Sequence, residues 1–128
     1  MLCIDVEPDS RVPSGEPTID GARALIPIID RLRATIADAT GTPAAFTWCL
    51  RMDPQIAVLY GSHDGIVAQL SPELDRLVAS GDELGLHVHT NRLIDGHWVA
   101  DFDDVAWLEH CFDTACDAFE NAFEVGTL

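Results

Sequence analysis

The chain has 128 residues, of which 48% are apolar and 23% charged, and a formal net charge of −15, which fits one soluble domain with a hydrophobic core. This excess of acid argues against nucleic acid and anionic membranes as partners, because both are bound through Lys and Arg. There is no run of about 18 apolar residues that would predict a transmembrane helix. Met1 leads straight into a strand-like segment without the basic and apolar regions of a secretory signal, so we expect a cytoplasmic protein.

The first elements read as a strand, a loop and a helix. Residues 2–7 alternate in polarity like a strand, and the prolines, glycine and serines of residues 8–19 predict a loop. Apolar residues at helical spacing predict a helix from Asp20, which we expect to cap it, to about Asp38. Pro27 lies inside this pattern and is expected to kink the helix or mark a second start.

The middle of the chain predicts a buried strand and a second helix. Residues 44–50 form a short, nearly continuous apolar run, which is typical of a strand covered on both faces in a parallel sheet. Residues 54–70 favour no single element. Ser71-Pro72-Glu73 has the composition of a helix start, and that helix is expected to run to Ser80, where Gly81 would end it.

The last third predicts a strand, a hairpin and a long helix. Residues 82–89 form the third predicted strand, and residues 91–103 a polar loop with a hairpin turn around Asp95-Gly96. An amphipathic helix is predicted from about Asp103 to Glu124. The final residues, 123–128, resemble a helix end that leads into another strand.

The predicted order of elements is strand-helix-strand-helix-strand-helix, which implies an α/β fold with a parallel sheet and right-handed crossovers. Three such units in one domain of residues 1–128 correspond to the N-terminal part of a TIM-like barrel, which needs about 250 residues. We therefore expect the chain to be an incomplete domain from a larger protein.

Two short motifs place metal-ligand side chains two residues apart. Asp5 and Glu7 end the first predicted strand, and His87 and His89 end the third. Residues i and i+2 of a strand point to the same face, so each pair should project together. A carboxylate with two imidazoles is the ligand set of many hydrolytic Zn²⁺ sites, which keep one position open for water.

A third pair of polar residues, Arg51 and Asp53, ends the second predicted strand. The active sites of barrels and open α/β sheets lie at the carboxyl ends of their strands. All three polar pairs thus fall at the edge where a site is expected. Arg51 and Asp53 either line a substrate pocket or pair with each other.

These motifs resemble those of the polysaccharide deacetylase family, also called the NodB-homology or carbohydrate esterase 4 superfamily. The resemblance is carried by residues 3–9 (Cys-Ile-Asp-Val-Glu-Pro-Asp) and 80–90 (Ser-Gly-Asp-Glu-Leu-Gly-Leu-His-Val-His-Thr). In the family, an acidic pair on strand one is followed by a later strand of the type Gly-x-Glu-hydrophobic-Gly-x-His. Both motifs match in order, whereas the rest of the chain matches only in layout.

The resemblance implies a deformed (β/α)₇ barrel, a divalent metal that is usually zinc, and removal of acetyl groups from an N- or O-acetylated sugar or polysaccharide. Asp5 would then be the general base, with Glu7 and His87 as metal ligands and His89 as a second histidine ligand. Arg51 and Asp53 would be substrate-binding residues. The donor set would also accept Co²⁺ or Ni²⁺.

The sequence departs from the family pattern in three respects. The usual second histidine lies four residues after the first, where this chain has Asn91, so that His89 must take its place. The second acid of the first motif is usually Asp, and here it is the longer Glu7. The family's later motifs, an Arg that orients the base and a His that acts as general acid, would lie beyond Leu128, so we do not expect turnover by this chain alone.

Other functions compete with this hypothesis. Amidohydrolases and PHP-type phosphoesterases also use a His-x-His pair, but on strand one, which here carries acids. A non-catalytic deacetylase-like domain that binds a glycan or a metal is the main alternative, and a structural α/β domain without a site is another. Asp9 is expected to be a loop residue, and Trp48 to pack in the core.

Overall fold

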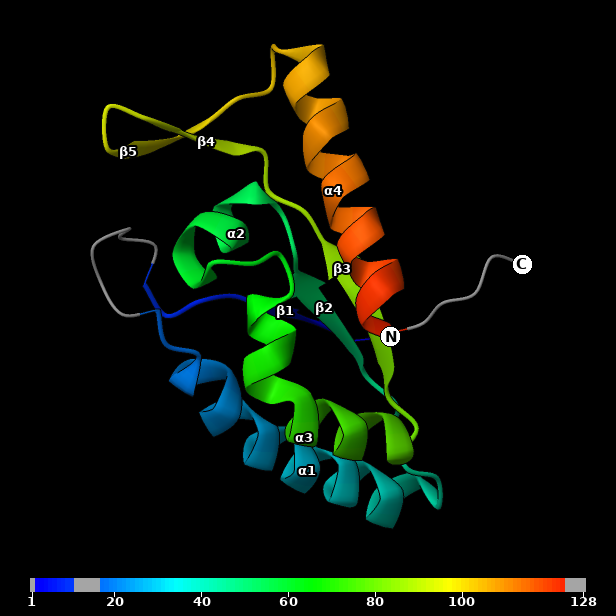
Figure 1. Cartoon of the computed structure of the whole chain (residues 1–128). Coiled ribbons are helices and arrows are strands. Elements are labelled where there is room, and N and C mark those ends of the chain that lie inside the picture. The colour runs from blue at the N-terminus through cyan, green and yellow to red at the C-terminus, as the bar shows by residue number, and fades with distance from the viewer. Residues whose placement is uncertain (1, 11–16, 124–128) are drawn as a thin grey trace.

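A three-stranded parallel sheet lies at the centre of the computed structural model, which describes residues 2–10 and 17–123 (Figure 1). Its strands are β1 (Cys3–Val6), β2 (Thr47–Arg51) and β3 (Glu83–His87), in the order β1-β2-β3. The mixed α/β class and the parallel pairing expected from the sequence are confirmed. The strand predicted after residue 123 falls on residues 124–128, which lie outside the described residues.

Helices make the crossovers between these strands. Helix α1 (Asp20–Thr40) links β1 to β2, and α2 (Pro54–Tyr60) and α3 (Gly65–Ala79) link β2 to β3. Helices α1 and α3 lie side by side (Figure 1), joined by Arg23 of α1, whose Nε lies 3.3 Å from an oxygen of Glu73. Ion pairs this exposed contribute little, so apolar packing must hold the two helices to the sheet.

One face of the sheet forms the hydrophobic core with these two helices. The buried cluster contains Ile4 and Val6 of β1, Trp48 and Leu50 of β2, and apolar side chains of α1 and α3. Burial of each large apolar side chain stabilises the fold by about 1.5–3 kcal/mol. The prediction that Trp48 packs in the core is confirmed, since it is 1% exposed.

The opposite face of the sheet carries polar and small residues. Asp5, Cys49 and Gly85 lie in register across the three strands, and all three keep at least part of their surface exposed. The expectation that residues 44–50 form a strand buried on both faces is therefore wrong. Strand β2 begins at Thr47. The face of the sheet that carries Trp48 and Leu50 packs against α1 and α3, and the other face does not.

Two helices continue through prolines that were expected to interrupt or start them. Helix α1 runs unbroken through Pro27, and α3 begins at Gly65 with Pro72 inside it. The prediction of a helix start at Ser71 is therefore wrong. Ile66, Leu70 and Leu77 of α3 all lie in the core, so apolar packing along the whole helix outweighs the cost of a missing N–H.

The N-terminus of α1 is capped from outside the helix by Asp9. The Asp9 carboxylate accepts hydrogen bonds from the backbone N–H groups of Asp20 at 2.7 Å and Gly21 at 2.9 Å, and from the Thr18 hydroxyl at 2.8 Å. A Cβ on Gly21 would lie 2.7 Å from an oxygen of this carboxylate, so a larger residue at this position would push the capping group away. The N-cap position is Ile19, so the expectation that Asp20 caps the helix is wrong, and Asp9 has a defined role within its loop.

These contacts lower the pKa of Asp9: burial would raise it, but the hydrogen bonds from Thr18, Gly21 and Asp20 outweigh that effect. We predict that Asp9→Ala lowers the free energy of unfolding by about 1 kcal/mol, the usual cost of losing a cap. Urea denaturation measures this change. The exposed Asp75→Ala in α3 is the control, and equal stability of the two variants would contradict the capping role.

A buried carboxylate, Asp82, ties the amino ends of β2 and β3 to α1. Its oxygens accept hydrogen bonds from Arg33 Nη2 at 2.6 Å, Trp48 Nε1 at 2.9 Å and the Phe46 N–H at 2.9 Å. Arg33 also donates to the Ala44 carbonyl and lies 5.0 Å from the centre of the Phe46 ring. This network lies at the end of the sheet opposite to the predicted metal ligands.

Loss of this carboxylate should destabilise the fold. Asp82→Ala leaves Arg33, the Trp48 indole and the Phe46 N–H without their acceptor, so we predict a loss of about 3 kcal/mol in the free energy of unfolding. Chemical denaturation against Glu83→Ala, which removes the exposed neighbouring acid, measures it. If Asp82→Ala lost no more unfolding free energy than Glu83→Ala, the result would contradict the role of the network.

The same substitution should change the response to acid. Burial raises the pKa of Asp82, but the hydrogen bonds from Arg33, Trp48 and Phe46 and the Arg33 charge outweigh burial and lower it. Its stabilising contribution is therefore complete above the ordinary Asp value and is lost as the pH falls through the lower folded pKa. We expect the unfolding free energy of Asp82→Ala to decline less steeply with acid than that of the parent.

A hairpin and a long helix complete the described chain. Strands β4 (Asn91–Ile94) and β5 (His97–Ala100) pair antiparallel, and the predicted turn at Asp95-Gly96 is confirmed, since both residues have positive φ. Helix α4 (Val105–Phe123) lies beside β3 (Figure 1). Among the helices in the described part of the chain, none combines the length and apolar character needed to cross a membrane.

Candidate metal centre

Three of the predicted site residues come together at the carboxyl end of the sheet. Glu7 follows β1, His87 ends β3, and His89 lies two residues further on. One ligand atom from each lies within 4.8 Å of the others, and this is the group that could hold a metal ion among residues 2–10 and 17–123. The predicted convergence of Glu7, His87 and His89 is therefore confirmed as a feature of the fold.

The side chains of this cluster meet above the middle strand. Neighbouring strands lie about 4.8 Å apart, so β1 and β3 are separated by roughly twice that distance. Long side chains must span this gap, and the middle-strand residue in register with His87 is Arg51. Nε2 of His89 lies 3.2 Å from Oε1 of Glu7.

The two imidazoles lie against each other and remain open to solvent. Their ring centres are 4.7 Å apart, with 57° between the ring planes. The side chain of His87 is 22% exposed and that of His89 24%. Strand β3 ends at His87, so His89 lies outside the strand that was predicted to carry it, yet its ring still faces the same cluster.

Asp5, the predicted general base, contacts the cluster through His87. Its Oδ1 lies 3.0 Å from Nδ1 of His87, and its side chain is 59% exposed. A proton on Nδ1 would face Asp5, and the lone pair on Nε2 would then be available to a cation. The contact orients the imidazole while leaving most of the carboxylate in solvent.

The surroundings of His89 favour its neutral form. Burial and the nearby charge of Arg51 lower its pKa, and together they outweigh the opposing effect of Glu7. Neutral imidazole is the form that binds a metal ion. The electrostatics of the cluster are thus compatible with a ligand role for His89.

Arg51 and Asp53 pair with each other beneath this cluster. Arg51 donates through Nε and Nη2 to the two Asp53 oxygens, each at 2.8 Å, and both side chains are 0% exposed. Of the two alternatives left by the sequence, mutual pairing is the one present in the fold. Binding of a substrate by these residues stays a prediction.

Two further residues of this network were missed by the sequence analysis. Gln55 Oε1 accepts hydrogen bonds from Arg51 Nη2 at 2.7 Å and Asn91 Nδ2 at 3.1 Å. Asn91, which stands where the family's second histidine is usual, is thus bound to Gln55. The Asp53-Pro54 pair, a typical helix start, was the available signal that α2 begins here and carries Gln55 in its first turn.

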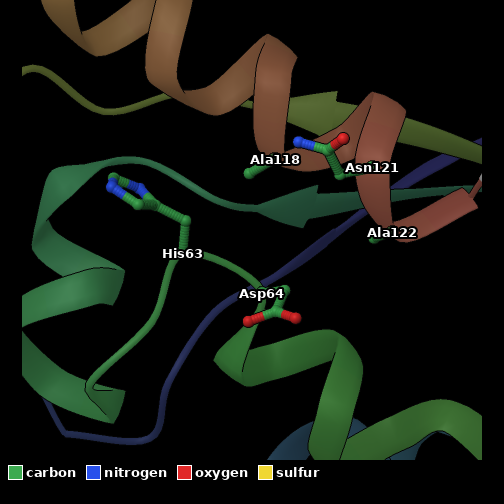
Figure 2. A pocket seen from close by; sticks show the side chains of 5 residues that line it. All are labelled: His63, Asp64, Ala118, Asn121 and Ala122. Carbon is green, nitrogen blue, oxygen red and sulfur yellow. The ribbon is translucent and has the colours of Figure 1, made fainter.

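Two of the cavities formed by the described residues lie on different parts of the surface. One of about 210 Å³ borders β1 and the start of α1, and Asp5, Glu7 and Asp9 are among its lining residues. The other, of about 260 Å³, lies between the α2–α3 link and α4 and is lined by His63, Asp64, Ala118, Asn121 and Ala122 (Figure 2). Of these two, the first adjoins the predicted ligands.

Comparisons with models of protein families, with curated proteins and with solved structures find no match for this chain. The fold is a mixed α/β arrangement around a three-stranded parallel sheet. The chemistry and placement of the residues just described are therefore what indicate a function.

Proposed function

We propose that this chain is the N-terminal part of a metal-dependent hydrolase of the polysaccharide deacetylase type, which removes acetyl groups from an N-acetylated sugar or polysaccharide. The observation that carries the proposal is the Glu7, His87 and His89 cluster with Asp5 beside it. The cluster joins residues from two strand ends that are far apart in the sequence. Chance gathering of these side chain types at this edge is a poor explanation of that placement.

The donor set fits zinc. One carboxylate and two imidazoles are ligands that Zn²⁺ accepts, and three protein ligands leave a coordination position open. All three side chains are partly exposed, Glu7 at 23%, so a cation can reach them from solvent. Bound there, zinc would supply a Lewis acid that polarises the acyl carbonyl and makes water a stronger acid.

Asp5 would act as the general base. Its carboxylate is exposed, adjoins the cluster through His87 and borders the 210 Å³ cavity along β1. A base in this position can take a proton from the water that attacks the acetyl group. His87, held by Asp5, would keep the orientation that its ligand role requires.

The barrel part of the proposal has support from the topology. The strands follow one another in the order β1-β2-β3, and α1 and α3 cover one face of the sheet. The opposite face, with Asp5, Cys49 and Gly85, would line the inside of a (β/α) barrel of the deacetylase type. Arg51, in register with His87 on this face, and its buried partner Asp53 would then form part of the floor of the active site.

A non-catalytic metal- or glycan-binding domain is the second candidate. The observation that favours it is Asn91, which is engaged with Gln55 in place of the family's usual second histidine. Such a domain would bind zinc without releasing acetate. The two functions therefore differ in whether the protein releases acetate.

The test combines zinc titration with an acetate assay. Calorimetry at neutral pH should show one equivalent of Zn²⁺ bound tightly to the chain. The full-length protein should release acetate from N-acetylglucosamine oligomers, and a chelator should stop the release. Zinc binding without acetate release would favour the non-catalytic domain. No zinc binding would overturn the hydrolase and the metal-binding form of that domain, and would leave only a glycan-binding domain.

A further inference from the structure

We propose that Asp53 is a positioning residue for His89: it fixes the main chain that carries this imidazole to the metal site. The inference rests on the proposed metal centre. It gives Asp53, predicted from the sequence to bind substrate, a different role. The Asp53 carboxylate is 0% exposed and accepts hydrogen bonds from a side chain and from two backbone N–H groups.

Asp53 connects three elements through its two oxygens. Oδ2 accepts hydrogen bonds from Arg51 Nε at 2.8 Å and from the backbone N–H of His89 at 3.1 Å. Oδ1 accepts from Arg51 Nη2 at 2.8 Å and from the backbone N–H of Gln55 at 3.0 Å. One carboxylate thus joins the end of β2, the first turn of α2 and the segment after β3.

That segment needs an anchor outside the sheets. Strand β3 ends at His87 and β4 begins at Asn91, so residues 88–90 belong to neither sheet. The His89 N–H therefore finds its acceptor in a side chain, and Asn91 at the far end of the segment donates to Gln55. The same buried network holds the segment in its middle and at its end.

The charge of Arg51 explains why the anchor is a carboxylate. A guanidinium that is 0% exposed requires an anionic partner, and the pair in turn holds Asp53 in one orientation. A ligand on a segment fixed in this way keeps its geometry before the cation arrives, which is what tight metal binding requires. Loss of the anchor should therefore weaken binding even though Asp53 touches no cation.

Asp53→Asn tests the inference, with Asp82→Asn as matched control. Both residues are buried carboxylates paired with an Arg and with a backbone N–H, but Asp82 lies at the opposite end of the sheet. We expect Zn²⁺ affinity, measured by calorimetry on folded protein, to fall about 10-fold in Asp53→Asn and to stay within about twofold in Asp82→Asn. Hydrogen exchange of the His89 amide in the metal-free chain should accelerate only in Asp53→Asn.

Each result bears on a different claim. A parent chain that binds no Zn²⁺ would overturn the metal site and this inference with it. Equal affinity and equal His89 exchange in the parent and Asp53→Asn would overturn the inference alone. If Asp53→Asn does not fold, hydrogen exchange of the His89 amide in the metal-free parent keeps the inference testable: the exchange should be slow, and exchange as fast as that of an unprotected amide would overturn the inference.

Discussion

Replacement of His87 or His89 by alanine is expected to weaken Zn²⁺ binding by more than about 100-fold, since even residues outside a ligand set contribute 10–100-fold. Each imidazole is one of three donors whose ligand atoms lie within 4.8 Å of one another. Two remaining donors cannot replace the lost bond, because Zn²⁺ sites use at least three protein ligands. Calorimetric titration of each variant measures the loss.

The control for these variants is a histidine outside the cluster. His97 lies exposed in β5, and His97→Ala should bind Zn²⁺ like the parent. Both histidines of the cluster are partly exposed, so their truncation should leave the fold intact, which circular dichroism checks. Tight binding that survives in His87→Ala and His89→Ala would place the cation elsewhere and remove the basis of the proposed function.

Asp5→Asn is expected to separate binding from turnover. The substitution keeps the shape of the side chain and removes its basicity, and general acid–base catalysis contributes about 10²–10⁴-fold to a rate. Acetate release by the full-length protein, measured at saturating Zn²⁺, should fall by that factor, whereas Zn²⁺ affinity should fall only about 10-fold, because Asp5 contacts the ligand His87 but lies outside the three-residue cluster.

The control for Asp5→Asn is a neighbouring exposed acid in a structural role. Asp9 caps α1 and borders the same cavity, so Asp9→Asn should leave the rate nearly unchanged. A large loss of zinc affinity in Asp5→Asn would instead mean that Asp5 serves the site through His87 rather than as the base. An unchanged rate would remove Asp5 from the mechanism.

The convergence of Glu7, His87 and His89 could be predicted from the sequence for a physical reason. A parallel sheet aligns the carboxyl ends of its strands, and a period of two along a strand decides which residues share a face. These two rules are sufficient to bring polar residues at successive strand ends to one edge. The three residues indeed meet there, although Glu7 and His89 lie just beyond β1 and β3.

The buried polar network could not be predicted in the same way. Arg51 and Asp53 look like exposed residues after a strand, and their burial depends on α2, in a stretch whose sequence pattern favours no single element. The bond from the His89 N–H to Asp53 joins backbone to side chain across distant segments, and such contacts leave no periodic signal. The start of α3 was missed because core packing along the helix outweighed the start-like chemistry of Ser71 and Pro72.

The distance in sequence between Glu7 and the two histidines links ion binding to folding. In the unfolded chain the carboxylate is far from the imidazoles, so that only His87 and His89 could hold a cation together there, and weakly. A cation would therefore bind preferentially to the native state. At a concentration 100 times its dissociation constant it would raise the free energy of unfolding by about 2.7 kcal/mol. The supply of zinc around the protein would then help to decide how much of it is folded at all, and not only how much of it is active.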